Sequence, residues 1–268
     1  MNSRRLFLVL ACTTVAAVTG CSGGTDARVG PPTRTSAVVV GVDERALPLP
    51  GVENARDVGG YRTVDGRQVR TGLVYRSGEL STASDPALAY LTGHDLKFDD
   101  DLRLRSEIAK APDRVAAGAA YRNVDVVGQA SPEVIASAQN AGPDLYRAFI
   151  TTPGANEGFA AILHDIIDTT AGTVLYHCSS GKDRTGWTTA VLLTVLGVDR
   201  QTVYYDFLLS NYYRDAAPGD TANGVVATAL DAAFDQADQS YGSFDNYVRN
   251  GLKLTDADVA ALQAKMLS

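Results

Sequence analysis

Cysteine is scarce in this sequence, and its scarcity restricts what the protein can be. The 268 residues include three cysteines: Cys12 and Cys21 lie near the N-terminus, and Cys178 lies far along the chain. If the chain is cut before Cys21 and Cys21 becomes a lipid-bearing thioether, Cys178 is the single free thiol. A domain with one thiol cannot form an internal disulfide, and its thiolate survives better in an oxidising compartment.

Positive charge and long apolar runs are also in short supply. Lys and Arg total 24 against 31 Asp and Glu, which gives a formal net charge of −7. This acidic balance argues against nucleic acid as a partner and against general adhesion to anionic membranes. No internal repeat is present, and no stretch after Cys21 is long and apolar enough to span a membrane. The 45% of hydrophobic residues can bury the core of one large or two small domains.

The N-terminus has the pattern of an export signal. Two arginines precede an apolar stretch over residues 6–18 that is too short to cross a membrane. Residues 3–8, SRRLFL, favour twin-arginine export, with general secretion as the alternative. Residues 18–21, VTGC, are similar to a bacterial lipobox, which predicts cleavage before Cys21 and its acylation; a signal peptide cut elsewhere is the alternative. Since two acyl chains anchor stably, we expect an exported protein on the outer face of the bacterial cytoplasmic membrane, or released from it.

The chain divides into three segments. Residues 1–20 form the predicted signal peptide, and its removal makes the formal net charge −9. Residues 21–36 are small, polar and rich in Pro and Gly, which predicts a flexible tether. Residues 37–268 form the predicted folded domain, which begins with a strand-like stretch at 38–40.

Residues 177–186, HCSSGKDRTG, are the most informative part of the sequence. They follow a β-branched apolar run and precede a helical one, so a strand, a loop and a helix N-terminus succeed one another. Backbone N–H groups of such a loop point at an anion, and the same positive field favours the thiolate of Cys178. Arg184 can grip two phosphate oxygens with its planar guanidinium. The motif therefore combines a nucleophile, an anion site and a clamp; a buried, inert Cys178 is the alternative.

Other patterns place this motif in an α/β domain. A hairpin is predicted from strands at 61–64 and 68–70 around an Asp-Gly turn. Further predicted elements are strands at 73–76 and 173–176 and helices at 85–91, 157–168, 187–196, 199–211 and 255–267. Thr255 and Asp258 have the spacing of a capping box. Helix, strand, loop and helix around the motif indicate a layered α/β fold with the site at the carboxyl end of a strand.

The loop at 177–186 resembles the active-site loop of the protein-tyrosine-phosphatase superfamily. The Lys-Asp pair within it narrows the resemblance to the bacterial tyrosine-phosphatase-like family of secreted, atypical tyrosine and dual-specificity phosphatases. Similar segments at 54–61, 75–80, 101–107 and 241–244 extend the resemblance from about Leu49 to the C-terminus. It implies a protein-tyrosine-phosphatase-like fold, in which helices flank a central, mostly parallel twisted sheet and the active-site loop joins a strand to a helix.

The same resemblance implies an activity and a class of substrate. The activity is hydrolysis of phosphomonoesters through a cysteinyl-phosphate, without metal or other cofactor. The substrates implied are phosphotyrosine and also phosphoserine/threonine or phosphoinositides. Two alternatives remain: a phosphate- or phosphoinositide-binding surface lipoprotein without turnover, and a sulfur carrier using a persulfide on Cys178. The intact Cys178 and Arg184 and the presence of candidate acids argue against the first, and the Arg184-Thr185 pair with the Lys-Asp insertion argues against the second, since sulfur transfer needs no phosphate clamp.

Roles for the loop residues follow from this chemistry. Cys178 is expected to attack phosphorus, Arg184 and loop N–H groups to stabilise the equatorial oxygens, and Thr185 to hydrogen-bond the departing thiolate. Lys182 is expected to face outward and offer a charge to a second phosphate, with a solvated lysine as the alternative. The residues expected to bind substrate are His177, Ser179, Ser180, Gly181, Lys182, Asp183 and Arg184.

A carboxylic acid must protonate the leaving oxygen and later deprotonate water. The Trp-Pro-Asp loop of many tyrosine phosphatases is missing, since Trp187 is the only tryptophan. Asp183 is the first candidate, with a structural carboxylate that accepts loop N–H bonds as the alternative. Asp101 is the second candidate, with a salt bridge to Arg103 or Arg76 as the alternative.

The sequence departs from the family pattern in two places. Asp99 and Asp100 stand where the family strand is usually apolar, which predicts a strand that ends early or lies at the edge of the sheet. The segment between Val127 and Tyr146 is short and rich in Ala, Ser and Gly, so the long helical lid of some relatives is not expected.

Overall fold

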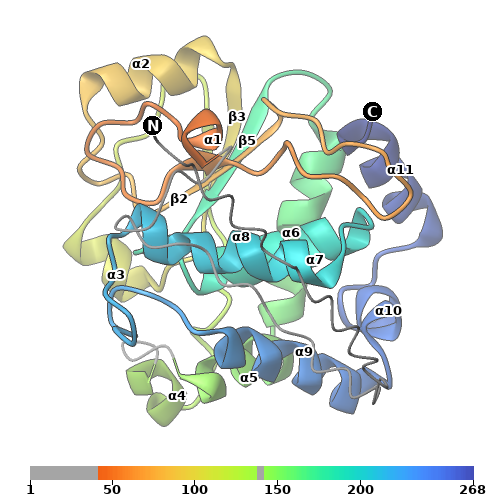
Figure 1. Cartoon of the computed structure of the whole chain (residues 1–268). Helices are drawn as coiled ribbons and strands as arrows, with labels where there is room; N and C mark the ends of the chain where they lie inside the picture. The colour runs from red at the N-terminus through yellow and green to blue at the C-terminus, as the bar shows by residue number, and fades with distance from the viewer. Residues whose placement is uncertain (1–41, 138–141) are drawn as a thin grey trace, which may run out of the picture.

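The computed structural model describes residues 42–137 and 142–268 (Figure 1). The predicted signal, the tether and the strand-like stretch at 38–40 lie outside the described residues. The strands are β1 (Arg56–Asp57), β2 (Val74–Ser77), β3 (Leu96–Asp101), β4 (Ala120–Asn123) and β5 (Thr173–His177). The helices are α1 (Val42–Arg45), α2 (Asp85–Gly93), α3 (Arg105–Lys110), α4 (Pro132–Ser137), α5 (Pro143–Thr151), α6 (Ala155–Asp168), α7 (Arg184–Val195), α8 (Arg200–Tyr213), α9 (Ala227–Tyr241), α10 (Phe244–Asn246), the π-helical η1 (Tyr247–Gly251) and α11 (Asp256–Met266).

A five-stranded sheet with the order β1-β2-β5-β3-β4 forms the centre of the fold. β1 is antiparallel to β2, and the other neighbouring strands are parallel. Because β5 lies between β2 and β3, the loop that follows it starts at the carboxyl edge of the sheet, flanked by the ends of both neighbours. The predicted α/β fold with a mostly parallel central sheet is confirmed.

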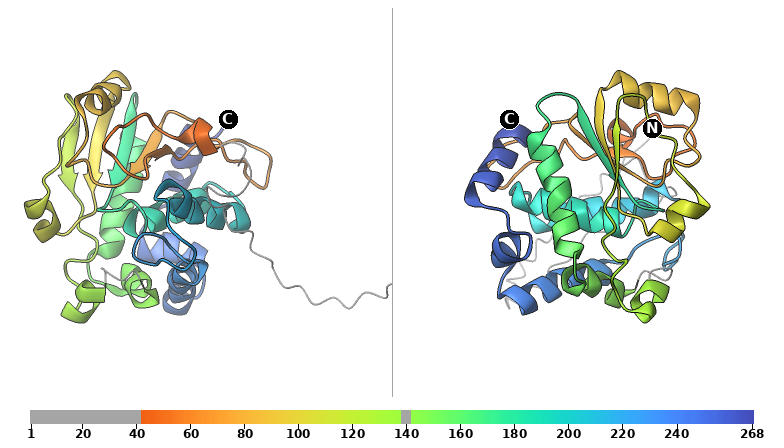
Figure 2. Two further views of the ribbon diagram at one scale, coloured as in Figure 1. Left: turned by 60° about the vertical axis from the view of Figure 1, so that its left-hand side comes forward. Right: turned by 180° about the vertical axis from the view of Figure 1, so that it is seen from behind.

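Helices cover both faces of this sheet (Figures 1 and 2). On one face, Tyr75 and Leu175 pack in a small core with Leu91 of α2. On the other face, Val174 and Tyr176 belong to the main core, which includes residues of α5 to α9 and α11. Alternate residues of β5 therefore enter different cores, as expected for a strand buried on both faces.

Helix α7 runs through the main core and is buried on all sides. All of its residues except Thr194 are buried, which explains why its sequence shows no polar face. The hydroxyls of Thr188 and Thr189 donate to the carbonyls of Arg184 and Thr185, both at 2.9 Å, so these polar groups are satisfied within the helix. The first turn of α7, which carries Arg184, is thus fixed by its surroundings.

The predicted helices, and the strands at 73–76 and 173–176, are confirmed with ends within three residues of those expected. The capping box of α11 is confirmed as well, because Thr255 and Asp258 exchange hydrogen bonds between side chain and backbone. The predicted hairpin is present as a short antiparallel pairing around the turn at 64–66: Val69 N donates to the carbonyl of Tyr61 at 2.8 Å and Thr63 N to that of Arg67 at 2.9 Å, with a bridge between Arg62 and Gln68. Among residues 42–137 and 142–268, no helix is long and apolar enough to cross a membrane.

The prediction that the strand before Asp101 ends early or lies at an edge is wrong. β3 continues through Asp101 and lies between β5 and β4. Its acidic residues are accommodated in two ways: His177 Nε2 lies 3.3 Å from Asp99 Oδ1, and burial raises the pKa of Asp100 to about 8, which favours its neutral form. In the described part of the segment from 127 to 146, the helices are the six-residue α4 and the start of α5.

Candidate active site

The loop between β5 and α7 carries Cys178 into a pocket. Cys178 directly follows the last residue of β5, and Arg184 is the first residue of α7. The pocket has a volume of about 360 Å³, and Cys178 is only 1% exposed, so the thiol lies deep. The pocket is lined by Leu104, Ser106, Glu107, Lys110, Ile135, Cys178, Ser179, Ser180, Lys182, Asp183, Arg184 and Ala222.

Glycine is required in this loop at position 181. Gly181 has φ +64°, in the left-handed region. A Cβ atom at this position would lie 2.5 Å from the backbone carbon and oxygen of Ser77 and 2.6 Å from the nitrogen of Gly78. The loop therefore packs directly on the carboxyl end of β2, which leaves no room for a side chain.

Two carbonyl groups of the loop accept hydrogen bonds from Asn54 and Arg76. The carbonyl of Gly181 accepts hydrogen bonds from Asn54 Nδ2 and Arg76 Nη2, both at 2.7 Å, and that of Ser180 accepts from Asn54 at 3.2 Å. In a trans peptide the following N–H points opposite to the carbonyl. The N–H groups of Gly181 and Lys182 are therefore turned away from Asn54.

Arg184 is oriented by Glu107 of α3. Its Nη1 and Nη2 donate to the two carboxylate oxygens of Glu107 at 2.7 and 2.9 Å, and Ser179 Oγ donates to the same carboxylate at 2.6 Å. Burial alone would raise the pKa of Glu107, but the hydrogen bonds and charge of Arg184 outweigh burial and lower it to about 2. Glu107 lies in a segment that resembles the family, yet the sequence alone did not reveal this role.

The Cys178 thiol is biased toward the thiolate. Its burial would raise the pKa, but the charge of Arg184 and hydrogen bonds from Thr185 outweigh burial and lower it below the ordinary value. The Thr185 hydroxyl is fully buried and is not engaged by a hydrogen bond to any other residue in the described part of the chain, which leaves it to the thiol beside it. The predicted proximity of Cys178, Arg184 and Thr185 is thus what the structure shows.

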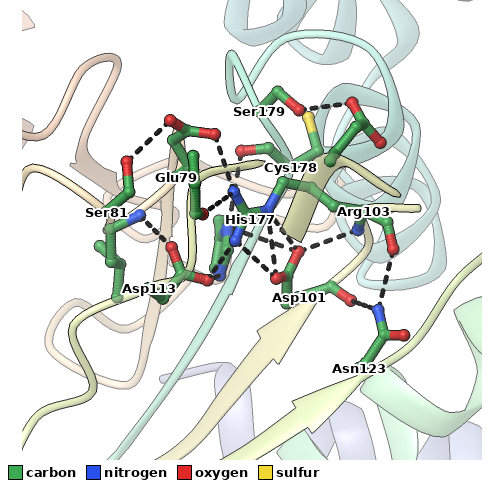
Figure 3. A network of polar contacts seen from close by, with 12 residues as sticks. Glu79, Ser81, Asp101, Arg103, Asp113, Asn123, His177, Cys178 and Ser179 are labelled. Carbon is green, nitrogen blue, oxygen red and sulfur yellow. Dashed lines mark hydrogen bonds and ion pairs between the residues drawn. The ribbon is translucent and has the colours of Figure 1, made fainter. Parts of the chain in front are cut away.

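His177 lies beside Cys178 in a buried network of charges (Figure 3). Its Nε2 is 3.3 Å from carboxylate oxygens of both Asp99 and Asp113, and its Nδ1 is 3.9 Å from Asp101. Burial alone would lower the pKa of His177, but these carboxylates raise it well above the ordinary value. His177 lies in the strand that leads into the loop and is not among the residues that line the pocket, so it supports the loop from within the sheet.

Arg103 completes this network, forms a salt bridge with Asp101 and lowers the pKa of that carboxyl group. The Arg103 guanidinium donates to both oxygens of Asp101 at 2.8 to 3.1 Å, to Asp113 at 2.6 Å and to Glu79 at 2.7 Å. Burial would raise the pKa of Asp101, but hydrogen bonds from Arg103 and the charge of His177 lower it. Of the two interpretations of Asp101, the structure shows the salt bridge to Arg103, and Asp101 does not line the pocket.

Three groups of this network could in principle ligate a metal ion. Donor atoms of Asp101, Asp113 and His177 lie within 4.8 Å of one another. The guanidinium of Arg103, however, already lies 2.8 Å from Asp101 and 2.6 Å from Asp113 and neutralises these carboxylates. The residues therefore fit an internal ion-pair network better than a metal site.

A second buried cluster lies behind the loop, around Asp206 of α8. Asp206 is 1% exposed and pairs with Arg56 at 3.2 Å and Arg76 at 2.9 Å, and Tyr61 Oη donates to it at 3.0 Å. Since Arg76 also holds the carbonyl of Gly181, this cluster anchors the loop to β2. The sequence contained a signal for it, because a carboxylate on the apolar stripe of a buried helix must have a partner.

Asp183 and Lys182 lie together at the other side of the loop. Asp183 lines the pocket and accepts a hydrogen bond from Tyr146 Oη at 2.8 Å, and Lys182 Nζ lies 3.1 Å from its second oxygen. The prediction that Lys182 faces outward is wrong: it is 4% exposed and also donates to the carbonyl of Thr221 at 3.2 Å. The carboxylate of its neighbour and the α8–α9 loop draw the ammonium group inward.

Comparisons with known proteins agree with this geometry. Residues 47–268 match the tyrosine phosphatase family. A protein of Cupriavidus necator, named as a candidate tyrosine-protein phosphatase, is 32% identical over 248 residues, covering 81% of this chain and 86% of the relative. The triple specificity protein phosphatase PtpB of Mycobacterium tuberculosis is 29% identical over 262 residues, covering 75% of this chain and 92% of the relative.

Proposed function

The chain belongs to the tyrosine phosphatase family and is a phosphatase of the protein-tyrosine-phosphatase type, and on that premise we propose that it acts through a cysteinyl-phosphate on Cys178. One observation carries the proposal: a thiol whose pKa is lowered and a buried guanidinium, Arg184, meet in one pocket. Phosphoryl transfer needs a nucleophile and a positive charge on the equatorial oxygens, and this pocket supplies both.

The reaction proceeds in two displacements. In the first, Cys178 Sγ forms a bond to phosphorus, the bond from phosphorus to the ester oxygen breaks, and Asp183 gives a proton to that oxygen. In the second, Asp183 takes a proton from water, the water oxygen bonds to phosphorus, and the P–S bond breaks to release phosphate and the Cys178 thiolate. Thr185 donates a hydrogen bond to the thiolate and helps it leave.

Preorganised charge supplies the transition-state stabilisation. Glu107 holds the Arg184 guanidinium in one orientation before substrate arrives, and the N–H groups of Gly181 and Lys182 are aimed by the carbonyls behind them. Such donors need no reorganisation during the reaction, and each is worth on the order of 10²-fold in kcat. Asp183 takes the acid role because it lines the pocket, whereas Asp101 does not.

Phosphotyrosine is the first substrate that we propose, with phosphoserine, phosphothreonine and phosphoinositides after it. The deep position of Cys178 suits a phosphate carried on a long side chain. A phosphoinositide with a second phosphate would need a further cation, and Lys182 is engaged by Asp183 and Thr221. Lys110 is an exposed cation at the same pocket and would take that role. The wider range is suggested by the name of the triple specificity relative.

Steady-state hydrolysis tests the activity most directly. The purified protein is assayed in EDTA with p-nitrophenyl phosphate, a phosphotyrosine peptide and a phosphoinositide, beside Cys178→Ser and the matched control Cys21→Ser. We expect turnover that survives EDTA, is lost in Cys178→Ser and is unchanged in Cys21→Ser. Turnover by Cys178→Ser would contradict the cysteinyl-phosphate. No turnover on any substrate, with phosphate protecting Cys178 from iodoacetamide, would point instead to a phosphate-binding surface protein.

We also propose that the protein is exported and held at the membrane by acylated Cys21. The support is the order of the N-terminal residues: two arginines, an apolar stretch, and Val-Thr-Gly before the cysteine. Cell fractionation of the full chain tests it. Cys21→Ser is expected to move the activity from the membrane fraction to the soluble fraction, and an unchanged membrane fraction would refute the lipid anchor.

A further inference from the structure

Asp183 occupies a helix-capping position without capping the helix. It is the N-cap residue of α7, where an aspartate ordinarily accepts a hydrogen bond from an N–H group of the first turn. Its side chain makes no such bond. It accepts instead from Tyr146 Oη at 2.8 Å and, across an ion pair, from Lys182 at 3.1 Å. The alternative of a structural carboxylate that binds loop N–H groups therefore does not hold.

The ring of Tyr146 is fixed by burial and by packing against two phenylalanine rings. It lies on α5, is fully buried, and packs against Phe149 at 5.1 Å and, edge to face, against Phe207 at 5.9 Å between ring centroids. Burial, followed by the charge of Asp183, raises the pKa of Tyr146 well above its ordinary value, so the hydroxyl keeps its proton and remains a donor. A rigid donor of this kind fixes the direction of a carboxylate.

We propose that Tyr146 is a positioning residue for the general acid Asp183. It turns the carboxylate away from the N–H groups of α7, which leaves those donors to the phosphate, and holds one oxygen so that the carboxyl group faces the leaving group. The inference rests on the proposed function, in which Asp183 protonates the leaving oxygen. Tyr146 touches neither substrate nor thiol in this scheme and acts only through Asp183.

This role predicts a dependence on the leaving group. A weakly basic leaving group such as p-nitrophenolate departs without protonation, whereas phenolate needs the proton that Asp183 supplies. Loss of the Tyr146 hydroxyl should therefore slow phenyl phosphate and spare p-nitrophenyl phosphate. A variant damaged only in packing would slow both substrates alike, because packing does not distinguish them.

The experiment compares Tyr146→Phe, Asp183→Asn and the double variant on both substrates, in the full chain. For Tyr146→Phe we expect kcat/KM, which reports the first displacement alone, to fall about 10-fold with phenyl phosphate and less than about 2-fold with p-nitrophenyl phosphate. In the double variant the Tyr146 change should add nothing to Asp183→Asn. The control is Tyr204→Phe, another buried tyrosine that donates to a carboxylate, Asp231 of α9, away from the pocket.

If Asp183→Asn shows the leaving-group dependence but Tyr146→Phe loses activity equally on both substrates, or on neither, the positioning role of Tyr146 is overturned. If Asp183→Asn itself lowers kcat/KM equally for both substrates, the assignment of the acid is wrong and the inference fails with it. Thermal unfolding of Tyr146→Phe and Tyr204→Phe separates folding from chemistry, since both lose one buried hydroxyl. The loss specific to phenyl phosphate must appear in Tyr146→Phe alone.

Discussion

Replacing Asp206 by Asn should strongly destabilise this protein. Asp206 is 1% exposed and lies between the fully buried guanidinium groups of Arg56 and Arg76. Asn keeps the shape and one acceptor oxygen but removes the negative charge. Two buried cations then remain without a counter-ion, which is far costlier than losing the pair together.

The magnitude follows from that geometry. Removing one partner of a buried ion pair costs about 3–5 kcal/mol, a large part of the 5–15 kcal/mol typical of a folded domain. For a domain of this size we expect the melting temperature to fall by roughly 6–20 °C. The charges of Arg56 and Arg76 outweigh the effect of burial and lower the pKa of Asp206, so its contribution is complete above about pH 4 and is lost as pH falls further.

Thermal unfolding at neutral pH, followed by circular dichroism, measures the effect. The matched control is Asp65→Asn, which removes the same charge from an ion pair with Arg67 that is about half exposed on both sides. The control should show no measurable shift. Because Arg76 also donates to the carbonyl of Gly181, kcat of the folded Asp206→Asn protein should fall as well. A shift no larger than that of the control would refute the argument that this buried cluster holds the loop.

Three further predictions concern the site and the sheet. Glu107→Gln should lower kcat about 10²-fold, because Gln can accept only one of the two hydrogen bonds from Arg184. Steady-state kinetics measures the loss, with the exposed Glu157→Gln as the control. An unchanged kcat in Glu107→Gln would contradict the role of Glu107. Burial, followed by the charge of Asp165, raises the pKa of Asp100 to about 8, so the folded protein keeps a proton on this group that the unfolded chain loses above about pH 4. The free energy of unfolding should therefore fall as pH rises from about 4 to about 8. Urea unfolding at several pH values should show no such fall for Asp100→Asn, and an equal dependence on pH in both proteins would count against the argument. Gly181→Ala should abolish turnover, because its Cβ would meet backbone at 2.5 Å, whereas Gly93→Ala, with open space around it, should not; turnover by Gly181→Ala would disprove the close packing of the loop.

The sequence by itself determined the local features of this protein. The period of apolar residues predicted helices such as the one at 157–168, because burial of one face imposes that period, and a continuous β-branched apolar run predicted the strand before Cys178. The loop at 177–186 was readable because its function needs consecutive residues: a thiol, a glycine that tolerates the left-handed region, and an arginine at the start of a helix. These properties depend on neighbours in the chain.

Only the tertiary structure decided which charges meet. Arg184 and Glu107 are 77 residues apart, and Arg56 and Asp206 are 150 apart. Their pairing follows from the strand order β1-β2-β5-β3-β4 and the packing of α3 and α8, which no local pattern encodes. The same holds for Lys182, which was expected to face solvent and turns inward to Asp183 and Thr221. A side chain's direction in a loop depends on which distant partner offers an opposite charge, and that partner is present only once the chain has folded.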